Sequence, residues 1–363
     1  MSPDLALVHD YLTQRGGAER VVAGWLDLFP EATLHTALYD ADATFTNFSQ
    51  ARIKTSWLNN VTFLRRNHRW CFPLLAPTMS HFRVEADVVL ASSSGWAHGV
   101  KTDGKLIVYC HAPARWLYQR DRYLARGQLG RVAGTASYFG GSLLRQWDQR
   151  AAQRADAYIA NSTFTQRMLK SVYNIDATVI HPFVSPPATL PNVTARNDVL
   201  IVARLLAYKN IELMCEVARS LPHLSFRIVG DGPLRESLEA NASSNVTFCG
   251  RVSDEILWQE YVNARVHLAL SYEDFGITPL EAAYAGIPTV ARNSGGYVDT
   301  ITSATGILVD DNSLGVDSIA AAVTTALART WNPIVLRQHA ENFSLERHGQ
   351  KIDQVISSLL TTP

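Results

Sequence analysis

Short apolar runs recur along this chain, and each is followed by a loop with glycine or charged residues and then by a helical pattern. Apolar runs of this length are typical of buried parallel strands, and their alternation with helices predicts crossover units. The runs lie at residues 5–8, 87–91, 105–110, 156–160, 198–202, 224–229, 246–249, 264–270 and 288–291. Because such crossovers share one hand, the loops at the carboxyl ends of the strands lie on one edge of a sheet, where ligands bind. The sequence therefore predicts an α/β fold of the doubly wound type.

The alternation restarts after a proline-rich, non-periodic stretch at residues 179–191, which we interpret as a boundary between two domains. A chain of 363 residues also exceeds what one hydrophobic core commonly supports. We expect Rossmann-like domains at residues 1–183 and 184–342, facing each other across a cleft. The final helical pattern, residues 343–363, predicts a terminal helix that packs back on the first domain.

Composition excludes several classes of protein. Hydrophobic residues make up 47% and charged residues 18%, and no run approaches the roughly 20 apolar residues of a membrane span. The first residues have neither a basic lead nor a long apolar core, so we expect no signal peptide and a cytosolic protein. The four cysteines are widely separated, which argues against metal and redox sites. A net charge of +0 argues against a general nucleic-acid binder.

The most informative loop is residues 271–281, between an apolar run and a helical pattern. It holds two carboxylates, Glu273 and Glu281, with Gly276 between them to let the backbone approach a ligand. A helix start at the carboxyl end of a strand favours an anion. The structural alternative is a capping box from Thr278 to Glu281, with Pro279 in the first turn. That alternative explains Glu281 and leaves Glu273 without a structural reason.

Other loops on the same predicted edges carry polar residues. Arg204 and Lys209 follow the run at 198–202, and two cations beside a helix start suit a diphosphate, although each taken alone is more often a solvated surface charge. His111 directly follows the run at 105–110, which favours a functional histidine over a structural one. Gly16 and Gly17 follow the first run and either form a turn or contact a phosphate or sugar.

A basic and aromatic segment spans residues 52–83 and contains no acidic residue. Its cations are Arg52, Lys54, Arg65, Arg66, Arg69 and Arg83, and its large apolar residues are Trp57, Phe63, Leu64, Trp70, Phe72, Leu74 and Leu75. This combination suits an anionic membrane surface, where each nearby cation contributes about 1 kcal/mol. A solvated basic face over an ordinary core is the alternative, and RNA binding is a weaker one.

These residues together resemble a known family. The segment with Arg204 and Lys209, the Gly-Asp-Gly-Pro of residues 230–233 and the Glu-x7-Glu of Glu273 and Glu281 are similar to the retaining nucleotide-sugar glycosyltransferases of family 4, which have the two-domain GT-B fold. Residues 9–12, 16–20 and 110–113, with Asn161-Ser and His181-Pro, resemble the bacterial O-antigen mannosyltransferase branch. The resemblance covers nearly the whole chain.

The resemblance implies a role for each matching residue. Arg204 and Lys209 would hold the donor diphosphate, Glu281 would bind the ribose, and Glu273 would contact the transferred hexose. His111 would face the hexose from the first domain, which is also expected to hold the acceptor. The remaining implied contacts are Gly16 and Gly17 with the phosphate and acceptor, the amides of Phe275, Gly276, Ile277 and Thr278 with the sugar ring and phosphate, and Gly250, Arg251 and Val252 with the base.

The resulting hypothesis is a retaining hexosyltransferase that moves mannose from GDP-mannose to a lipid-linked or polysaccharide acceptor, at the inner face of the cell membrane. We expect no cofactor and no metal, because the two cations take the metal's role and Asp40-x-Asp42 lies far from them in sequence. The same transfer from a UDP-sugar, a sugar-nucleotide epimerase on the same fold, and a non-catalytic nucleotide-binding module are the alternatives.

Overall fold

The computed structural model describes residues 3–67, 71–119 and 133–361, and the chain divides into two compact units. The N-terminal unit comprises Met1–His181 and His348–Pro363, and the C-terminal unit comprises Pro182–Arg347. The chain thus leaves the N-terminal unit two residues before the expected boundary and rejoins it within the last helix, which begins at Leu345. Among the described residues, no helix combines the length and apolar character that crossing a membrane requires.

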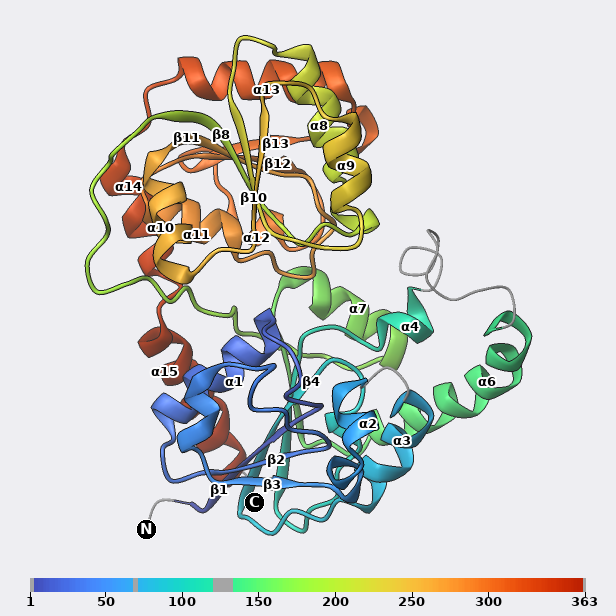
Figure 1. Ribbon diagram of the computed structural model, residues 1–363. Helices are drawn as coiled ribbons and strands as arrows, with labels where there is room; N and C mark the ends of the chain where they lie inside the picture. Colours follow the sequence, from blue (N-terminus) through green and yellow to red (C-terminus); the bar gives the residue numbers. More distant parts are fainter. Residues whose placement is uncertain (1–2, 68–70, 120–132, 362–363) are drawn as a thin grey trace. The chain divides into compact units, whose positions relative to one another are not determined.

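The N-terminal unit contains one sheet and its covering helices (Figure 1). Its elements are β1 (Leu5–His9), α1 (Gly17–Leu28), β2 (Thr33–Thr36), η1 (Thr46–Gln50), β3 (Ile53–Thr55), η2 (Trp57–Asn60), α2 (Thr62–Arg66), α3 (Phe72–His81), β4 (Val88–Ser93), η4 (Ala97–Gly99), β5 (Lys105–Cys110), α4 (Arg115–Tyr118), α6 (Ala133–Ala152), β6 (Ala157–Ala160), α7 (Thr163–Tyr173), β7 (Thr178–Val179) and α15 (Leu345–Thr361).

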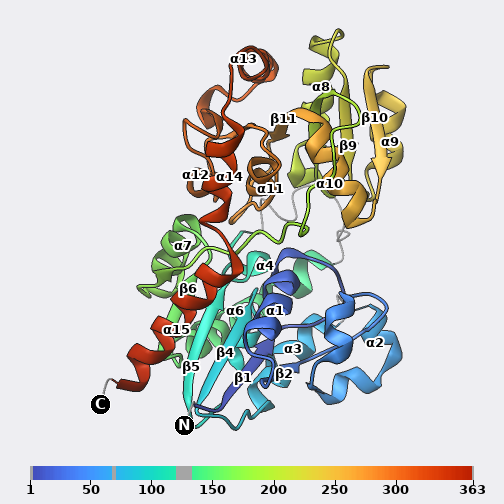
Figure 2. The same cartoon turned by 90° about the vertical axis from the view of Figure 1, so that its left-hand side faces the viewer.

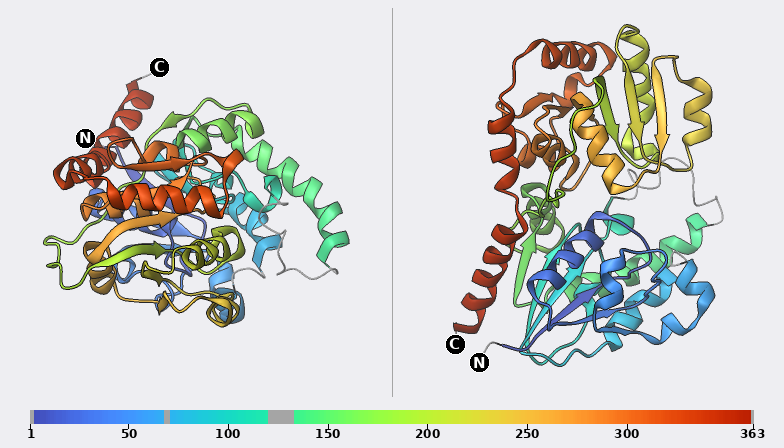
Figure 3. Two further views of the ribbon diagram at one scale, coloured as in Figure 1. Left: turned by 90° about the horizontal axis from the view of Figure 1, so that it is seen from above. Right: turned by 60° about the vertical axis from the view of Figure 1, so that its left-hand side comes forward.

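The seven strands of this sheet run parallel in the order β3-β2-β1-β4-β5-β6-β7. Helices α1 and α15 lie on one face of it (Figure 2). Trp25 of α1 donates from Nε1 to Nε2 of His348 in α15 at 2.9 Å, and its ring meets Tyr109 of β5 edge-on at 5.4 Å. Figure 3 shows α15, drawn in red, beside these strands in its right-hand view. The opposite face packs on α3, α6 and α7 through one continuous apolar core.

The C-terminal unit has the same construction with a smaller sheet. Its elements are β8 (Asn197–Val202), η5 (Ala207–Lys209), α8 (Ile211–Ser220), β9 (Phe226–Val229), α9 (Arg235–Asn241), β10 (Val246–Gly250), α10 (Asp254–Asn263), β11 (Ala264–Ala269), α11 (Thr278–Tyr284), β12 (Thr289–Arg292), α12 (Tyr297–Thr300), β13 (Gly306–Val309), η6 (Asp311–Ser313), α13 (Val316–Ala328) and α14 (Pro333–Glu341).

Its six strands run parallel in the order β10-β9-β8-β11-β12-β13. Helices α8, α9 and α13 bury one face of the sheet, and α10 and α11 bury the other. The strand order reverses between β1 and β4 in one unit and between β8 and β11 in the other. These are the places where open parallel sheets bind ligands. The doubly wound fold predicted from the sequence is confirmed in both units.

Candidate active site

The loops after β8 and β11 lie next to each other, because these two strands are neighbours at the point where the strand order reverses. The first loop carries Arg204 and Lys209, and the second carries Glu273. Lys209 Nζ forms an ion pair with Glu273 Oε1, and the two side chains are only 12% and 18% exposed. Asn210 joins the loops again, since its Nδ2 donates to the Leu270 carbonyl at 2.9 Å. The structure therefore brings together these residues, which are widely separated in the sequence.

Tyr208 is a member of this site that sequence reasoning did not single out. Nη2 of the exposed Arg204 donates to the Tyr208 hydroxyl at 3.2 Å. Lys209 Nζ lies 5.0 Å from the centre of the Tyr208 ring, which attracts a cation through its π face. One tyrosine thus orients both cations, and the only sequence signal for it was an aromatic residue next to the lysine.

Glycines of the 230–233 segment support the loop that carries Arg204. A Cβ on Gly230, whose φ is +136°, would lie 1.9 Å from the Ala203 carbonyl oxygen, and one on Gly232 would lie 2.5 Å from that of Leu205. The Leu205 amide also donates to the Asp231 carbonyl at 3.0 Å. The Gly-Asp-Gly-Pro sequence is therefore a scaffold for the cation loop, because no larger residue fits against it.

The backbone of Glu273 is held by the loop between β12 and α12. The Gly296 amide donates to the Glu273 carbonyl at 2.9 Å, and a Cβ on Gly295 would come within 2.3 Å of the same oxygen. Gly276, with a φ of +82°, packs on the Tyr297 ring, where a Cβ would meet Cε1 at 2.3 Å. Burial and the negative charge of Glu273 raise the pKa of Tyr297 above its ordinary value. Glu273 therefore sits on a rigid support, and Gly276 has a packing reason beyond approach to a ligand.

The predicted capping box at Thr278–Glu281 is wrong. Helix α11 begins at Thr278, its N-cap is Ile277, and no side chain caps it, although Pro279 does lie in the first turn. The Glu281 carboxylate instead accepts a hydrogen bond from Tyr261 of α10, whose hydroxyl donates to Oε2 at 2.7 Å. Glu281 is only 7% exposed.

The other residues predicted to contact the nucleotide sugar lie in two kinds of environment. The side chains of Phe275 and Ile277 pack into an apolar core, so a ligand would meet their backbone amides. Gly250 ends β10 and accepts from the Gly230 amide at 2.8 Å, with Arg251 exposed and Val252 partly buried beyond it. Because β9 separates β10 from β8, these three residues lie further along the same sheet edge than the two cations.

In the N-terminal unit, His111 lies directly after β5, as the sequence predicted. Its Nε2 is 2.9 Å from Ser92 Oγ of β4, and its carbonyl accepts from Asn161 Nδ2 at 3.0 Å. Burial of the ring and the positive charges of nearby residues, His9 first among them, lower the pKa of His111 to about 3. The imidazole is therefore neutral at physiological pH and can donate or accept one hydrogen bond at each nitrogen.

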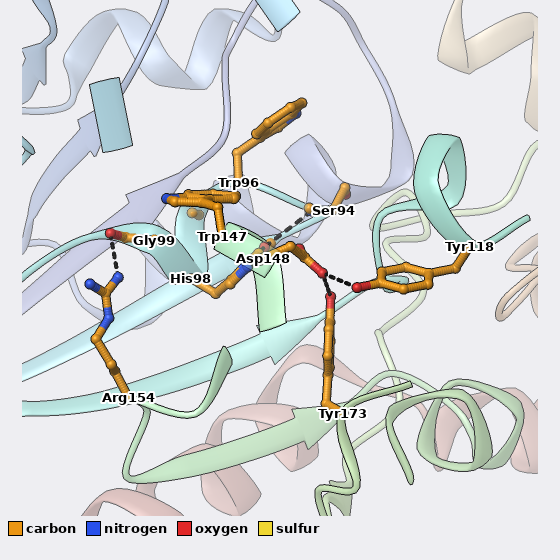
Figure 4. Close-up of polar contacts among 12 residues, drawn as sticks. Ser94, Trp96, His98, Gly99, Tyr118, Trp147, Asp148, Arg154 and Tyr173 are labelled. Carbon is orange, nitrogen blue, oxygen red and sulfur yellow. Dashed lines mark hydrogen bonds and ion pairs between the residues drawn. The ribbon is translucent and has the colours of Figure 1, made fainter. Parts of the chain in front are cut away.

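A buried network around Asp148 of α6 holds the loops on either side of His111 (Figure 4). The hydroxyls of Tyr118 and Tyr173 both donate to Asp148 Oδ2 at 2.7 Å, and His98 Nε2 lies 3.1 Å from Oδ1. Tyr118 belongs to α4, which follows His111, and His98 belongs to η4, which follows β4. Asp148 thus fixes two loops at the carboxyl edge of this sheet, and its place in a long amphipathic helix gave no sign of that role.

Gly16 and Gly17 precede and begin α1, at the carboxyl end of β1. A Cβ on Gly16 would lie 2.5 Å from Glu19 Oε2, so this glycine leaves room for a buried carboxylate. At Gly17, a Cβ would meet no heavy atom of the described residues within 4 Å. The described residues therefore give no packing reason for glycine at position 17.

We expect Gly17→Ala to fold normally, with stability raised by about 0.4–1 kcal/mol, because alanine favours helix and restricts the unfolded chain. If a phosphate contacts this helix start, the added methyl group should weaken ligand binding by about 1–3 kcal/mol. The measurement is the KM of the donor and acceptor in Gly17→Ala beside Gly315→Ala, which changes an equally open glycine at the start of α13. Equal KM values in both variants would remove Gly17 from the ligand site.

Comparison with known proteins agrees with this geometry. Residues 15–186 match the family model described as Glycosyltransferase Family 4, and residues 188–343 match the one described as Glycosyl transferases group 1. The two parallel sheets, each covered by helices on both faces, have the GT-B architecture of known glycosyltransferases. Both models describe glycosyltransferase domains and together they span most of the chain, so its two units are a family 4 domain and a group 1 domain of a glycosyltransferase of the GT-B type.

Solved structures show the same fold. HepE of Anabaena, in complex with UDP-glucose, aligns with a TM-score of 0.69 and 16% identity, covering 98% of this chain and 100% of that one. Sucrose-phosphate synthase of Thermosynechococcus elongatus aligns with a TM-score of 0.71 and 19% identity, covering 99% and 100%. At these identities the likeness concerns the fold.

Curated relatives match over shorter stretches. A GDP-mannose-dependent alpha-(1-6)-phosphatidylinositol monomannoside mannosyltransferase of Mycolicibacterium smegmatis is 29% identical over 50% of this chain and 55% of its own length. The sulfoquinovosyl transferase SQD2 of Arabidopsis thaliana is 34% identical over 28% of this chain and 21% of its own length. The chain thus spans about half or less of the length of the curated relatives it matches.

Proposed function

We propose that this chain transfers a hexose from a nucleotide sugar to a glycan acceptor, and that the donor is GDP-mannose. The observation that carries the proposal is the Lys209–Glu273 ion pair beside Arg204, at the switch point of the C-terminal sheet. Mannose and GDP are supported by the mycobacterial relative and by the resemblance to the O-antigen mannosyltransferase branch. The acceptor we propose is a lipid-linked or polysaccharide glycan.

The site suits a donor that brings both negative charge and hydroxyl groups. Arg204 is exposed, so its guanidinium can bind a diphosphate. Lys209, by contrast, forms an ion pair with Glu273. A diphosphate would share the Lys209 charge, and Glu273 would then accept hydrogen bonds from the hexose hydroxyls. Charge-assisted bonds of this kind are about twice as strong as neutral ones, and cations aimed at the leaving diphosphate stabilise its developing charge.

We further propose that transfer retains the anomeric configuration. The bond from the sugar carbon to the phosphate oxygen breaks, the acceptor oxygen bonds to that carbon from the same face, and the acceptor proton moves to the leaving phosphate oxygen. This scheme is supported by the engagement of the two carboxylates, since Glu273 holds Lys209 and Glu281 accepts from Tyr261. Neither carboxylate is arranged as a free nucleophile of the kind that covalent glycosidases use.

A direct assay tests the proposal. Purified protein is incubated with GDP-mannose, UDP-sugars and ADP-sugars, with and without a lipid-linked glycan, and products are identified by mass spectrometry. The expected result is a release of GDP that depends on the presence of the acceptor. Formation of an isomerised nucleotide sugar from the donor alone would instead favour an epimerase, and no turnover of any nucleotide sugar would contradict the proposal.

We propose that turnover requires no divalent ion, because the side chains of Arg204 and Lys209 supply the positive charge that a metal gives other transferases. Asp40 and Asp42 form a local turn instead, with the Asp42 amide donating to Asp40 Oδ1 at 3.3 Å. The expected result is an unchanged initial rate after dialysis against EDTA. Abolition of turnover, with recovery on adding Mg²⁺ or Mn²⁺, would contradict this expectation.

Only part of residues 52–83 is exposed and available for the predicted membrane contact. Arg52 pairs with Glu31 and Arg83 with Asp103, so both ends of the segment are neutralised. Phe72 and Leu75 pack in the core, and Arg69 and Trp70 lie outside the described residues. The exposed remainder, called here the η2–α3 surface, comprises Trp57 (60% exposed), Val61, Phe63 (59% exposed) and Leu74, with Arg65 and Arg66 of α2.

Large apolar side chains beside arginines are suited to the interface of an anionic bilayer, so we propose that the η2–α3 surface contacts the inner face of the cytoplasmic membrane. Trp57→Ser/Phe63→Ser should weaken binding to vesicles containing anionic lipid, measured by flotation, by about 100-fold or more, given about 1.5–3 kcal/mol for each large side chain fully buried. Ile334→Ser, which removes an apolar side chain 65% exposed on α14, is the control. Equal flotation of all three proteins, or flotation indifferent to lipid charge, would refute the contact.

A further inference from the structure

Four polar side chains of the N-terminal unit form a continuous series that ends on His111. His9 Nε2 lies 3.7 Å from Glu19 Oε1, and His9 Nδ1 lies 2.9 Å from Ser92 Oγ. The same Ser92 Oγ lies 2.9 Å from His111 Nε2. Glu19, His9 and Ser92 are at most 2% exposed, so this series does not reach solvent through them. The sequence reasoning assigned a role to His111 alone.

The single hydroxyl hydrogen of Ser92 couples the two histidines. It can be donated to only one of the two ring nitrogens, and the oxygen then accepts from the other. If His9 donates from Nδ1, Ser92 donates to His111 Nε2, and a neutral His111 carries its hydrogen on Nδ1. If Ser92 donates to His9, it accepts from His111 Nε2, and Nδ1 of His111 has no hydrogen. The hydrogen position on His9 therefore selects the tautomer of His111.

The buried carboxylate favours the first arrangement. Burial lowers the pKa of His9, but the hydrogen bond and charge of Glu19, with the charge of Asp10, raise it above its ordinary value overall. Burial raises the pKa of Glu19, but interaction with His9 and a hydrogen bond from Gln14 lower it overall. Both partners are therefore charged over a wider pH range than either would be alone. A protonated His9 carries hydrogen on both ring nitrogens, so its Nδ1 donates to Ser92.

We propose that Glu19, His9 and Ser92 are positioning residues that hold His111 in the tautomer with hydrogen on Nδ1. Nδ1 is the ring nitrogen that remains for a ligand, because it makes no hydrogen bond within residues 3–67, 71–119 and 133–361. The inference rests on the proposed function and on the role that the family resemblance implies for His111, a contact with the hexose: the relay makes His111 a hydrogen-bond donor to a sugar oxygen. The charged and titratable groups around the two rings are Glu19, Asp10, Arg115 and His348.

The relay is tested by imidazole nitrogen NMR on the full chain without substrate, with the His111 signals assigned by their loss in His111→Asn. Wild type should show His111 with hydrogen on Nδ1. Ser92→Ala should lose this preference, because Nε2 no longer accepts a hydrogen bond. Ser93→Ala is the matched control, since Ser93 is equally buried and bonds the Nδ1 of a different histidine, His98, at 3.0 Å. Unchanged His111 signals in Ser92→Ala would overturn the proposal.

Replacing the carboxylate tests the origin of the preference. Glu19→Gln removes the negative charge that favours protonation of His9, so the preference of His111 for hydrogen on Nδ1 should weaken. The control is Glu31→Gln, which changes an exposed carboxylate of the same unit. If His111 keeps its hydrogen on Nδ1 in Glu19→Gln, the carboxylate does not set the tautomer.

Activity supplies the second readout. Ser92→Ala should lower kcat by about tenfold or more and leave the KM of the nucleotide sugar within about twofold, as expected for a contact that matters in the transition state. Equal losses of kcat in Ser92→Ala and Ser93→Ala would show a purely structural role and overturn the proposal. Because the NMR measurement needs no turnover, it remains decisive even if the proposed transferase activity fails its own assay.

Discussion

Glu273→Gln is expected to lower kcat by about 100-fold and to change the affinity for the nucleoside diphosphate little, because an amide cannot strengthen its hydrogen bonds as positive charge develops on the sugar. The variant keeps the size of the side chain and its backbone support from Gly295 and Gly296. Loss of the partly buried ion pair with Lys209 should cost about 1 kcal/mol of stability, between the values for exposed and buried pairs. Steady-state kinetics and thermal unfolding measure the two effects separately.

Glu260→Gln is a matched control for this prediction. Glu260 is also a partly buried glutamate paired with a cation of the C-terminal unit, since its carboxylate accepts from Nε and Nη2 of Arg227. It should lose stability to a similar extent and retain kcat. Activity of Glu273→Gln within about threefold of wild type would show that this carboxylate does not contact the reacting sugar, since one such group is worth about two orders of magnitude.

Lys209→Ala is expected to weaken binding of the nucleoside diphosphate by about 1.5–3 kcal/mol, or roughly 10- to 150-fold, because a charged hydrogen bond to phosphate is lost. Its kcat should also fall, since the leaving diphosphate loses a compensating charge. Lys105→Ala removes a lysine whose Nζ lies 3.3 Å from Asp156, at the amino end of β5, and is the control. Similar dissociation constants for wild type and Lys209→Ala, measured by calorimetry, would place the diphosphate elsewhere.

Much of the fold could be predicted from the sequence, because fully buried parallel strands appear in it as continuous apolar runs. The run at 105–110 coincides with β5 and the run at 264–270 with β11 to within one residue. Strands β2, β3, β7 and β13 were not predicted. In β2 the sequence Thr-Leu-His-Thr contains one strongly apolar residue, and His35 and Thr36 are nonetheless buried. Edge strands such as β3 are short and half exposed, so their runs are weak.

The candidate site, too, has residues that the sequence predicts and residues that it does not. The strand-end positions of Arg204, Lys209, Glu273 and His111 could be predicted, because each residue follows a predicted strand and strand ends meet at one edge. The hydrogen-bond and packing partners of these residues could not be predicted, because they depend on contacts between segments that are distant in the sequence. Tyr261 reaches Glu281 from another helix, and this contact explains why a good capping sequence at Thr278 forms no capping box. At this helix start, the buried hydrogen bond between two helices outweighs the capping preference of the local sequence.

The relay behind His111 had no signal in the sequence for a related reason. Ser92 lies in a run of three serines that reads as a loop, and only the register of β4 against β1 places it opposite His9. The distinction between Ser92, which contacts His111, and Ser93, which contacts His98, follows from alternation of side chains along a strand.

Calorimetric titration of wild type and Arg204→Ala/Lys209→Ala with GDP, UDP and ADP shows whether the two cations after β8 bind a nucleoside diphosphate. Wild type should bind one of these nucleotides, with GDP preferred, and the double variant, folded with an unchanged circular dichroism spectrum, should bind it at least about 100-fold more weakly. Equal affinity in the two proteins, or no binding of any nucleoside diphosphate to wild type, would contradict it.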